Sequence, residues 1–210
     1  MITKEAELLL IFARAPWKKY TFTELKKTSG KKSKSYLQSF IEKFIKEGIL
    51  LQEKVGHLPI YSLNLFSTKA RDYGGFVLEH DGWNRKSIPF NDMQKLMDKI
   101  NYKEYIFIIT GSYAKATQTK HSDIDVVILI EDNLEPKKVY AELKLQCELN
   151  IPKIHLYVFK HSEFIQMLTN KEANYGKEIV KNYLILTEGQ IYLKIIEGAI
   201  KNGFNNRSLA

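Results

Sequence analysis

The chain has 210 residues, of which 44% are hydrophobic and 27% are charged. This composition is that of an ordinary globular protein, and it excludes a disordered or collagen-like chain. A single cysteine, Cys147, excludes an internal disulfide framework and a structural zinc site built from several cysteines.

The sequence gives no sign of a membrane or secretory segment. No apolar run approaches the roughly 20 residues needed to span a bilayer. The N-terminus carries Lys4, Glu5 and Glu7 instead of a basic region followed by a long apolar core. We therefore expect a cytoplasmic protein with no membrane partner.

The formal net charge of +8 is distributed unevenly. Residues 1–65 hold 12 lysine or arginine residues against 6 acidic ones, so most of the excess lies in the first third of the chain. This asymmetry favours a nucleic acid partner. The alternative is a lysine-rich surface that only interacts with water.

The first 65 residues predict three helices and a hairpin. Apolar spacing indicates a helix over residues 5–15, which Pro16 ends. A second helix is expected over 21–30 and a third over 33–48, each with a hydroxyl residue to cap its start and a glycine to close its end. Residues 49–63 then predict two short strands joined at a glycine.

This order is typical of a winged helix-turn-helix, which we predict over residues 1–65. Lysines gather in the turn before the third helix, at the start of that helix and on the hairpin, where they would meet the phosphates and base edges of double-stranded DNA. A small helical bundle or a protein-interaction module are the alternatives. The predicted DNA-binding residues are Lys26, Lys27, Lys31, Lys32, Lys34 and Lys54.

Residues 66–101 are predicted to be a helical linker. A helix over 66–78 is expected to break at Gly74-Gly75, and Asp81-Gly82 indicates a turn. The apolar spacing of residues 89–100 predicts a second linker helix.

Residues 102–210 predict a small mixed-sheet domain, so the fold class of the whole chain is α/β (α+β). Three short apolar runs read as strands, and helical patterns separate them. The expected strands are 105–110, 125–130 and 153–159, and the expected helices are 136–149, 162–168, 179–183 and 190–199.

Two short segments of this domain carry chemistry. Gly111-Ser112 follows the first expected strand, and a glycine there lets a phosphate approach free backbone amides and a hydroxyl. Asp123 and Asp125 are two residues apart at the start of the next strand, so their carboxylates project from the same face. Paired carboxylates of this kind bind Mg²⁺, which in phosphoryl and nucleotidyl transfer bridges triphosphate oxygens.

Gly111-Ser112 followed by Ser122-Asp123-Ile124-Asp125 resembles the signature of the polymerase-beta-type nucleotidyltransferase superfamily. The resemblance runs from about Tyr105 to Phe164 and is closest to the small archaeal and bacterial minimal nucleotidyltransferases. It implies that Gly111 and Ser112 hold the phosphates of an NTP and that Asp123 and Asp125 bind Mg²⁺. Archaeal proteins with a winged helix ahead of this domain are known, so the resemblance implies an archaeal-type architecture for the whole chain.

The third strand departs from this pattern, because active members usually carry a third carboxylate there. His155 stands at that position and is included among the candidate catalytic residues. It could be a general base, or transfer could rely on the two carboxylates alone, as in some members of the superfamily. The other alternative is a polar filler in a site that binds nucleotide without turnover. Glu163 lies just beyond the strand, where it either replaces the acid or caps a helix.

Further polar residues border the motif. Lys115 and Ser122 are predicted to bind nucleotide, and Lys120 and His121 are weaker candidates that lie in the same stretch. Solvated side chains are the alternative for all of them.

Two functions follow from these features. In the first, the chain is an enzyme that transfers NMP from NTP to an acceptor hydroxyl; the acceptor could belong to a toxin-like protein partner, as in minimal nucleotidyltransferases that act as antitoxins. In the second, it is a nucleotide-sensing transcriptional regulator. Winged helices often bind two-fold DNA sites as homodimers, so we also expect a homodimer.

Overall fold

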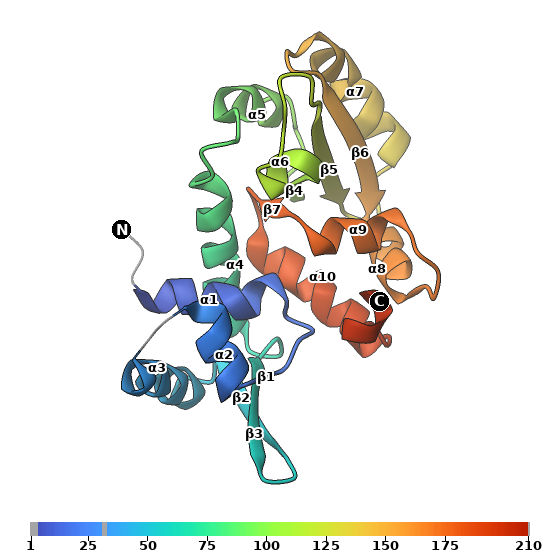
Figure 1. Ribbon diagram of the computed structural model, residues 1–210. Coiled ribbons are helices and arrows are strands. Elements are labelled where there is room, and N and C mark those ends of the chain that lie inside the picture. The colour runs from blue at the N-terminus through green and yellow to red at the C-terminus, as the bar shows by residue number, and fades with distance from the viewer. Residues whose placement is uncertain (1–3, 31–32, 210) are drawn as a thin grey trace. The chain divides into compact units, whose positions relative to one another are not determined.

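Two groups of elements make up the structure, a computed structural model that describes residues 4–30 and 33–209 (Figure 1). The first unit contains the chain up to Leu78 together with Gly189–Arg207, and the second contains Glu79–Glu188 and the residues from Ser208. The C-terminal helix therefore packs with the N-terminal unit. The domain ranges 1–65, 66–101 and 102–210 remain a prediction about independent folding.

The first unit confirms the predicted order of three helices and a hairpin. Its three strands form one antiparallel sheet in the order β1-β3-β2, in which Leu50 pairs with Leu63 and Tyr20 with Tyr61. Whether this arrangement works as a winged helix remains a prediction. Its elements are α1 (Lys4–Arg14), β1 (Tyr20–Thr21), α2 (Phe22–Ser29), α3 (Lys34–Lys46), β2 (Leu50–Val55), β3 (Leu58–Leu63), most of α4 (Thr68–Trp83), α10 (Gly189–Lys201) and the start of the 3-10 turn η1 (Asn206–Leu209).

Local hydrogen bonds set the ends of α2 and α3. Thr21 and Glu24 form a capping box, in which the Glu24 amide donates to Thr21 Oγ1 at 3.3 Å and the Thr21 amide donates to Glu24 Oε2 at 2.7 Å. Gly30 closes α2 with φ of 62°. The Ser33 hydroxyl accepts from the Tyr36 amide at 3.3 Å and starts α3.

Helix α4 runs unbroken through three glycines, so the predicted break at Gly74-Gly75 and the predicted turn at Asp81-Gly82 are wrong. A Cβ on Gly75 would overlap the backbone of Gly189 and Gln190, so α4 and α10 approach closely at this point. Glycine is needed there for contact between two helices rather than for a turn.

The second unit is built on a mixed four-stranded sheet, as predicted. The strand order is β6-β5-β4-β7, with β5 and β6 parallel and the other pairs antiparallel. The elements are α5 (Phe90–Met97), β4 (Tyr105–Thr110), α6 (Gly111–Lys115), β5 (Ile124–Ile130), α7 (Pro136–Leu149), β6 (Ile154–Lys160), α8 (His161–Thr169), α9 (Tyr175–Lys181) and β7 (Leu184–Ile185).

Alternating side chains divide the sheet into two faces. One face packs in a single apolar cluster with α5 and α7. Helix α8 contacts β5 and β6, and it packs against α9. The buried residues of the first cluster include Phe107, Ile109, Ile124, Val126, Ile128, Met93, Leu96, Val139, Leu143 and Cys147.

The predicted helix over residues 179–183 is wrong in its second half. Helix α9 ends at Lys181, and β7 then pairs with β4 through Ile108↔Ile185 and Ile109↔Leu184. Two residues are too few to show the alternation of a strand in the sequence.

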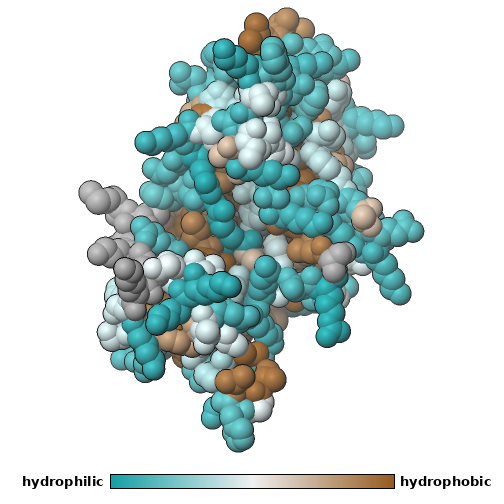
Figure 2. Space-filling model, viewed as in Figure 1, coloured by the Kyte–Doolittle hydropathy of each residue, from teal (hydrophilic) through white to brown (hydrophobic). Residues whose placement is uncertain are grey.

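Hydrophilic residues cover most of the visible surface of both units (Figure 2). An exception is the hairpin tip, where Val55 and Leu58 are both more than half exposed. In the described part of the chain, no helix combines the length and the apolar character needed to cross a bilayer.

Candidate functional site

Strand register brings three polar residues into one row across the sheet. Thr110 pairs with Asp125 between β4 and β5, and Asp125 pairs with His155 between β5 and β6. Side chains directly opposite one another on neighbouring strands point to the same face. Asp123 precedes β5 by one residue and Asp125 by two, so its carboxylate joins the same face.

His155 lies between the two aspartates. Its Nε2 is 3.1 Å from Asp123 Oδ2, and its Nδ1 is 3.7 Å from Asp125 Oδ1. The side chains of His155, Asp123 and Asp125 are 46%, 39% and 28% exposed, so solvent and a ligand can reach all three. The predicted trio is thus brought together, and His155 faces both carboxylates.

Burial raises the pKa of Asp125 above its ordinary value, and the charge of Asp123 raises it further. His155 acts in the opposite direction and lowers this pKa through its charge and hydrogen bond. The two carboxylates repel one another unless a cation or a proton compensates, which makes their shared face a favourable place for positive charge.

Gly111 touches the Asp125 carboxylate with its backbone. Its φ is 66°, in the left-handed region, and a Cβ added there would overlap Asp125 Oδ2. The preceding Thr110 is buried and donates its hydroxyl to the Asn182 carbonyl at 2.8 Å, which fixes the end of β4. Both the dihedral angle and the contact require glycine at this position.

The loop between α6 and β5 is held by its own hydrogen bonds. The Thr119 amide donates to the Ser122 hydroxyl oxygen at 2.8 Å, and the hydroxyl of buried Tyr113 lies 3.5 Å from the Ser122 carbonyl oxygen. Ser122 therefore shapes the loop that presents Asp123. Lys120 and His121 lie exposed in this loop.

A pocket of about 130 Å³ opens beside Asp125 and includes the exposed Lys115. In its wall the rings of Tyr157 and Tyr175 lie 4.6 Å apart between centroids, tilted by 45°. Burial, followed by the nearby Tyr157, raises the pKa of Tyr175. The sequence reasoning missed these residues. Tyr157 could have been found, because it follows His155 by two positions on the same strand, whereas nothing local relates Tyr175 to the motif. The lining is Thr110, Gly111, Lys115, Asp125, Tyr157, Tyr175, Glu178 and Asn182.

Other polar candidates have structural explanations. Glu163 Oε2 accepts from the Lys160 amide at 2.8 Å, so it caps α8 as the second of the two alternatives expected. Cys147 is buried, which raises the pKa of its thiol to about 11. Within residues 4–30 and 33–209, no group of three or more His, Cys, Asp and Glu side chains is arranged to hold a metal ion.

The predicted DNA-binding lysines that the structure describes are all exposed. Lys26 and Lys27 lie in the last turn of α2, Lys34 is the first residue of α3, and Lys54 lies on β2. Lys31 and Lys32 lie outside the described residues.

Comparison with known proteins identifies the second unit. The family model of the nucleotidyltransferase domain matches residues 84–186. No curated protein matches the chain. A solved structure described as the crystal structure of the toxin-antitoxin with AMP-PNP is 20% identical, covers 55% of this chain and 84% of its own, and has a TM-score of 0.39. This chain therefore contains a nucleotidyltransferase domain over residues 84–186.

Proposed function

We propose that this chain is a cytoplasmic, Mg²⁺-dependent nucleotidyltransferase that transfers NMP from an NTP to an acceptor hydroxyl. One observation carries the proposal: within the matched domain, Asp123 and Asp125 share a solvent-accessible face, and the backbone of Gly111 lies against one of them. Carboxylates beside a partly buried glycine at a strand-to-helix turn suit a ligand that brings both phosphates and a cation.

Asp123 and Asp125 are the residues that would hold Mg²⁺. Both carboxylates approach the same imidazole, at 3.1 and 3.7 Å, so both are directed toward one small region. Magnesium is typically bound by one or two carboxylates, with water and substrate phosphates completing its shell, so a third protein ligand is not required. The bound ion would supply polarisation of the phosphoryl oxygens.

The remaining residues of the site would bind the nucleotide. The Gly111 and Ser112 backbone would take phosphate oxygens, and Lys115 would add a positive charge at the same pocket. The acceptor oxygen would form a bond to the α-phosphorus as the bond from that atom to the bridging oxygen breaks. Pyrophosphate then leaves, and the hydroxyl proton passes to solvent.

We also propose that the first unit binds double-stranded DNA as a winged helix. The order of α1, α2 and α3 before the β2–β3 hairpin supports this proposal, as do the exposed lysines at the end of α2, the start of α3 and the hairpin. Phosphate contacts from such lysines would position the chain on DNA. A homodimer on a two-fold DNA site follows as a further proposal.

The second candidate is a nucleotide-sensing regulator that does not turn nucleotide over. His155 favours it, because β6 places an imidazole against both aspartates where active relatives are expected to have an acid. An antitoxin-type minimal nucleotidyltransferase, whose acceptor belongs to a toxin-like partner, is a special case of the first candidate.

Incubation with labelled NTPs tests the proposed activity. The purified chain should release pyrophosphate and transfer label in the presence of Mg²⁺, alone or with cell extract, because a partner can supply the acceptor. Excess EDTA should reduce both signals to background. Nucleotide binding without either signal would support the regulator instead.

We expect His155→Gln to lower transfer only a few-fold. Both imidazole nitrogens face carboxylate oxygens, so neither is directed at an acceptor hydroxyl, and the side chain orients the aspartates. A general base would contribute about 10² to 10⁴ in rate. The measurement is the pH profile of kcat/KM: a hundredfold loss with removal of one limb of the profile would show that His155 is the base.

A further inference from the structure

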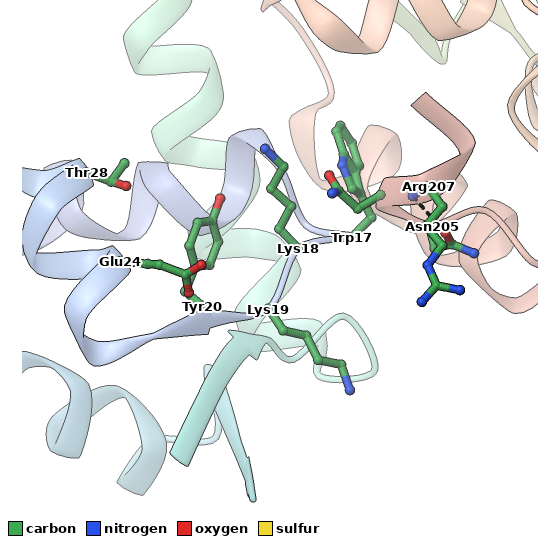
Figure 3. Close-up of a pocket in the computed structure, with 9 residues that line it drawn as sticks. Trp17, Lys18, Lys19, Tyr20, Glu24, Thr28, Asn205 and Arg207 are labelled. Carbon is green, nitrogen blue, oxygen red and sulfur yellow. Dashed lines mark hydrogen bonds between the residues drawn. The ribbon is translucent and has the colours of Figure 1, made fainter. Parts of the chain in front are cut away.

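A second polar groove lies in the first unit and shares no residue with the nucleotidyltransferase site. It has a volume of about 660 Å³. Figure 3 shows Lys18 and Lys19 on the segment between α1 and β1, with Arg207 and Asn205 from the C-terminal segment on the other side. The lining is Trp17, Lys18, Lys19, Tyr20, Glu24, Thr28, Asn205, Asn206 and Arg207.

Positive charge predominates in this groove. Among its described lining residues the one carboxylate is that of Glu24. The capping box uses it, because it accepts from the amide and the hydroxyl of Thr21 at 2.7 and 2.8 Å. Lys19 pairs with Glu53 at 2.5 Å, but both side chains are about half exposed, so water weakens the pair. Within the part of the chain that is described, Lys18 and Arg207 form no ion pair. Two cations thus remain available to an anion.

The aromatic side of the groove is held firmly. The Trp17 ring packs edge-on against buried Phe204, with 5.2 Å between centroids, and the Tyr20 ring packs in the same way against Phe12 at 5.4 Å. Burial raises the pKa of Tyr20 to about 12, with a further contribution from Glu24, so this ring stays neutral. Fixed aromatic rings beside cations are the combination on which bases stack while phosphates are neutralised.

One hydrogen-bond donor in the wall lacks an acceptor. Trp17 Nε1 is buried and has no partner among the described residues. Because this atom is closed off from solvent, it does not serve a ligand in the groove, and the contribution of Trp17 is its ring. The indole therefore offers the groove a fixed ring surface.

We infer that this groove binds a nucleotide unit, a phosphate joined to an aromatic base, presented either by a free mononucleotide or by a single-stranded nucleic acid. Lys18 and Arg207 contact the phosphate, and Trp17 and Tyr20 lie along the base. The inference does not rest on nucleotidyl transfer. The groove is a separate binding site from the surface of α3 and the hairpin that we propose for double-stranded DNA.

The test measures binding of a labelled eight-nucleotide single strand to the full chain by fluorescence anisotropy, in EDTA to suppress binding at Asp123 and Asp125. Lys18→Gln with Arg207→Gln should weaken binding about tenfold. It should also lower the slope of log K against log salt by about 1.4, because two phosphate contacts are lost at about 0.7 each. Lys46→Gln with Lys194→Gln removes the same charge from exposed positions of the first unit outside the groove, and it should change affinity less than about twofold.

Trp17→Phe provides an independent readout. It keeps a ring against Phe204 and removes the Nε1 donor. Binding should quench tryptophan fluorescence in the wild type, and this quenching should disappear in Trp17→Phe although Trp83 remains to report any quenching elsewhere.

Competition then distinguishes the two sources of the nucleotide unit. If AMP and ATP displace the strand, the ligand is a free nucleotide. If the strand binds and neither nucleotide displaces it, the ligand is a single-stranded nucleic acid. The inference would be overturned if the Lys18/Arg207 variant and the Lys46/Lys194 control bound the strand with equal affinity. Quenching of tryptophan fluorescence that survives in Trp17→Phe would also overturn it. Label transfer by wild-type protein is unaffected by either result, so this failure cannot be mistaken for failure of the proposed enzyme.

Discussion

Replacing Asp123 and Asp125 together with asparagine is expected to reduce nucleotidyl transfer by about a thousandfold or more. The two carboxylates are the charges to which we assign the metal, and charge stabilisation by a metal in the transition state amounts to several kcal/mol. Asparagine keeps the shape of each side chain, so the loss would come from charge and ligand strength. Label transfer and pyrophosphate release measure the effect.

A matched control removes two negative charges at positions away from the site. Asp98→Asn with Glu172→Gln changes two exposed residues of the second unit, and it should leave transfer within about twofold. Mg²⁺ should raise the Tm of the wild type and of this control, because an ion that binds only the folded state stabilises it. It should not raise the Tm of the Asp123/Asp125 variant. Transfer that persists in that variant would remove these residues from the catalytic site.

The pH dependence of the free energy of unfolding provides a second test of Asp125. The pKa of Asp125 is higher in the folded protein than its ordinary 3.8, first because of burial. A carboxyl of this kind binds its proton more tightly when folded, so stability falls as the pH rises from about 3.8 through the folded pKa. Above that range the ionised group opposes folding. Asp125→Asn should therefore not lower the free energy of unfolding at neutral pH without metal.

The proposed DNA surface should respond independently. Lys34→Glu with Lys54→Glu places negative charge at the start of α3 and on the hairpin, so binding to double-stranded DNA should weaken while label transfer continues. The Asp123/Asp125 variant should show the reverse pattern. If both pairs of changes reduced transfer equally, the assignment of the two functions to separate surfaces would be wrong.

The sequence predicted those parts of the fold that depend on local patterns. The bounds of β4 and α7 agree with the expected ranges. A buried apolar run and an amphipathic repeat can each be recognised from the residues of the segment alone. The spacing of Asp123 and Asp125 likewise predicted a shared face. The pairing of Asp125 with His155 depends in addition on β5 and β6 being parallel neighbours in one register, which no local pattern predicts.

The features that the sequence did not predict depend on distant contacts. Gly75 appeared to be a helix breaker because its partner, the backbone at Gly189, lies more than a hundred residues away. Glycine in a helix interior costs about 1 kcal/mol relative to alanine, and the approach of α10 outweighs this cost. Tyr175 joins the pocket beside Asp125 for the same kind of reason, since only the folded arrangement of α9 brings it there.

Gly111→Ala is expected to lower transfer by on the order of a hundredfold while the protein stays folded. The new Cβ would overlap Asp125 Oδ2, so the carboxylate would have to turn away from the face that it shares with Asp123. A displacement of about 1 Å in an active site can cost about 10²-fold in rate. Alanine at a φ of 66° also adds backbone strain of about 1 kcal/mol, which by itself does not touch catalysis.

Gly30→Ala separates these two effects. Gly30 has nearly the same φ, 62°, but a Cβ there meets no atom of the described residues within 4 Å. Both variants should therefore lose similar stability from strain, measured by denaturant unfolding, and only Gly111→Ala should lose transfer and the rise of Tm with Mg²⁺. If Gly111→Ala kept full activity, Asp125 would have room to move without consequence, and a fixed geometry of the two carboxylates could not be part of the mechanism.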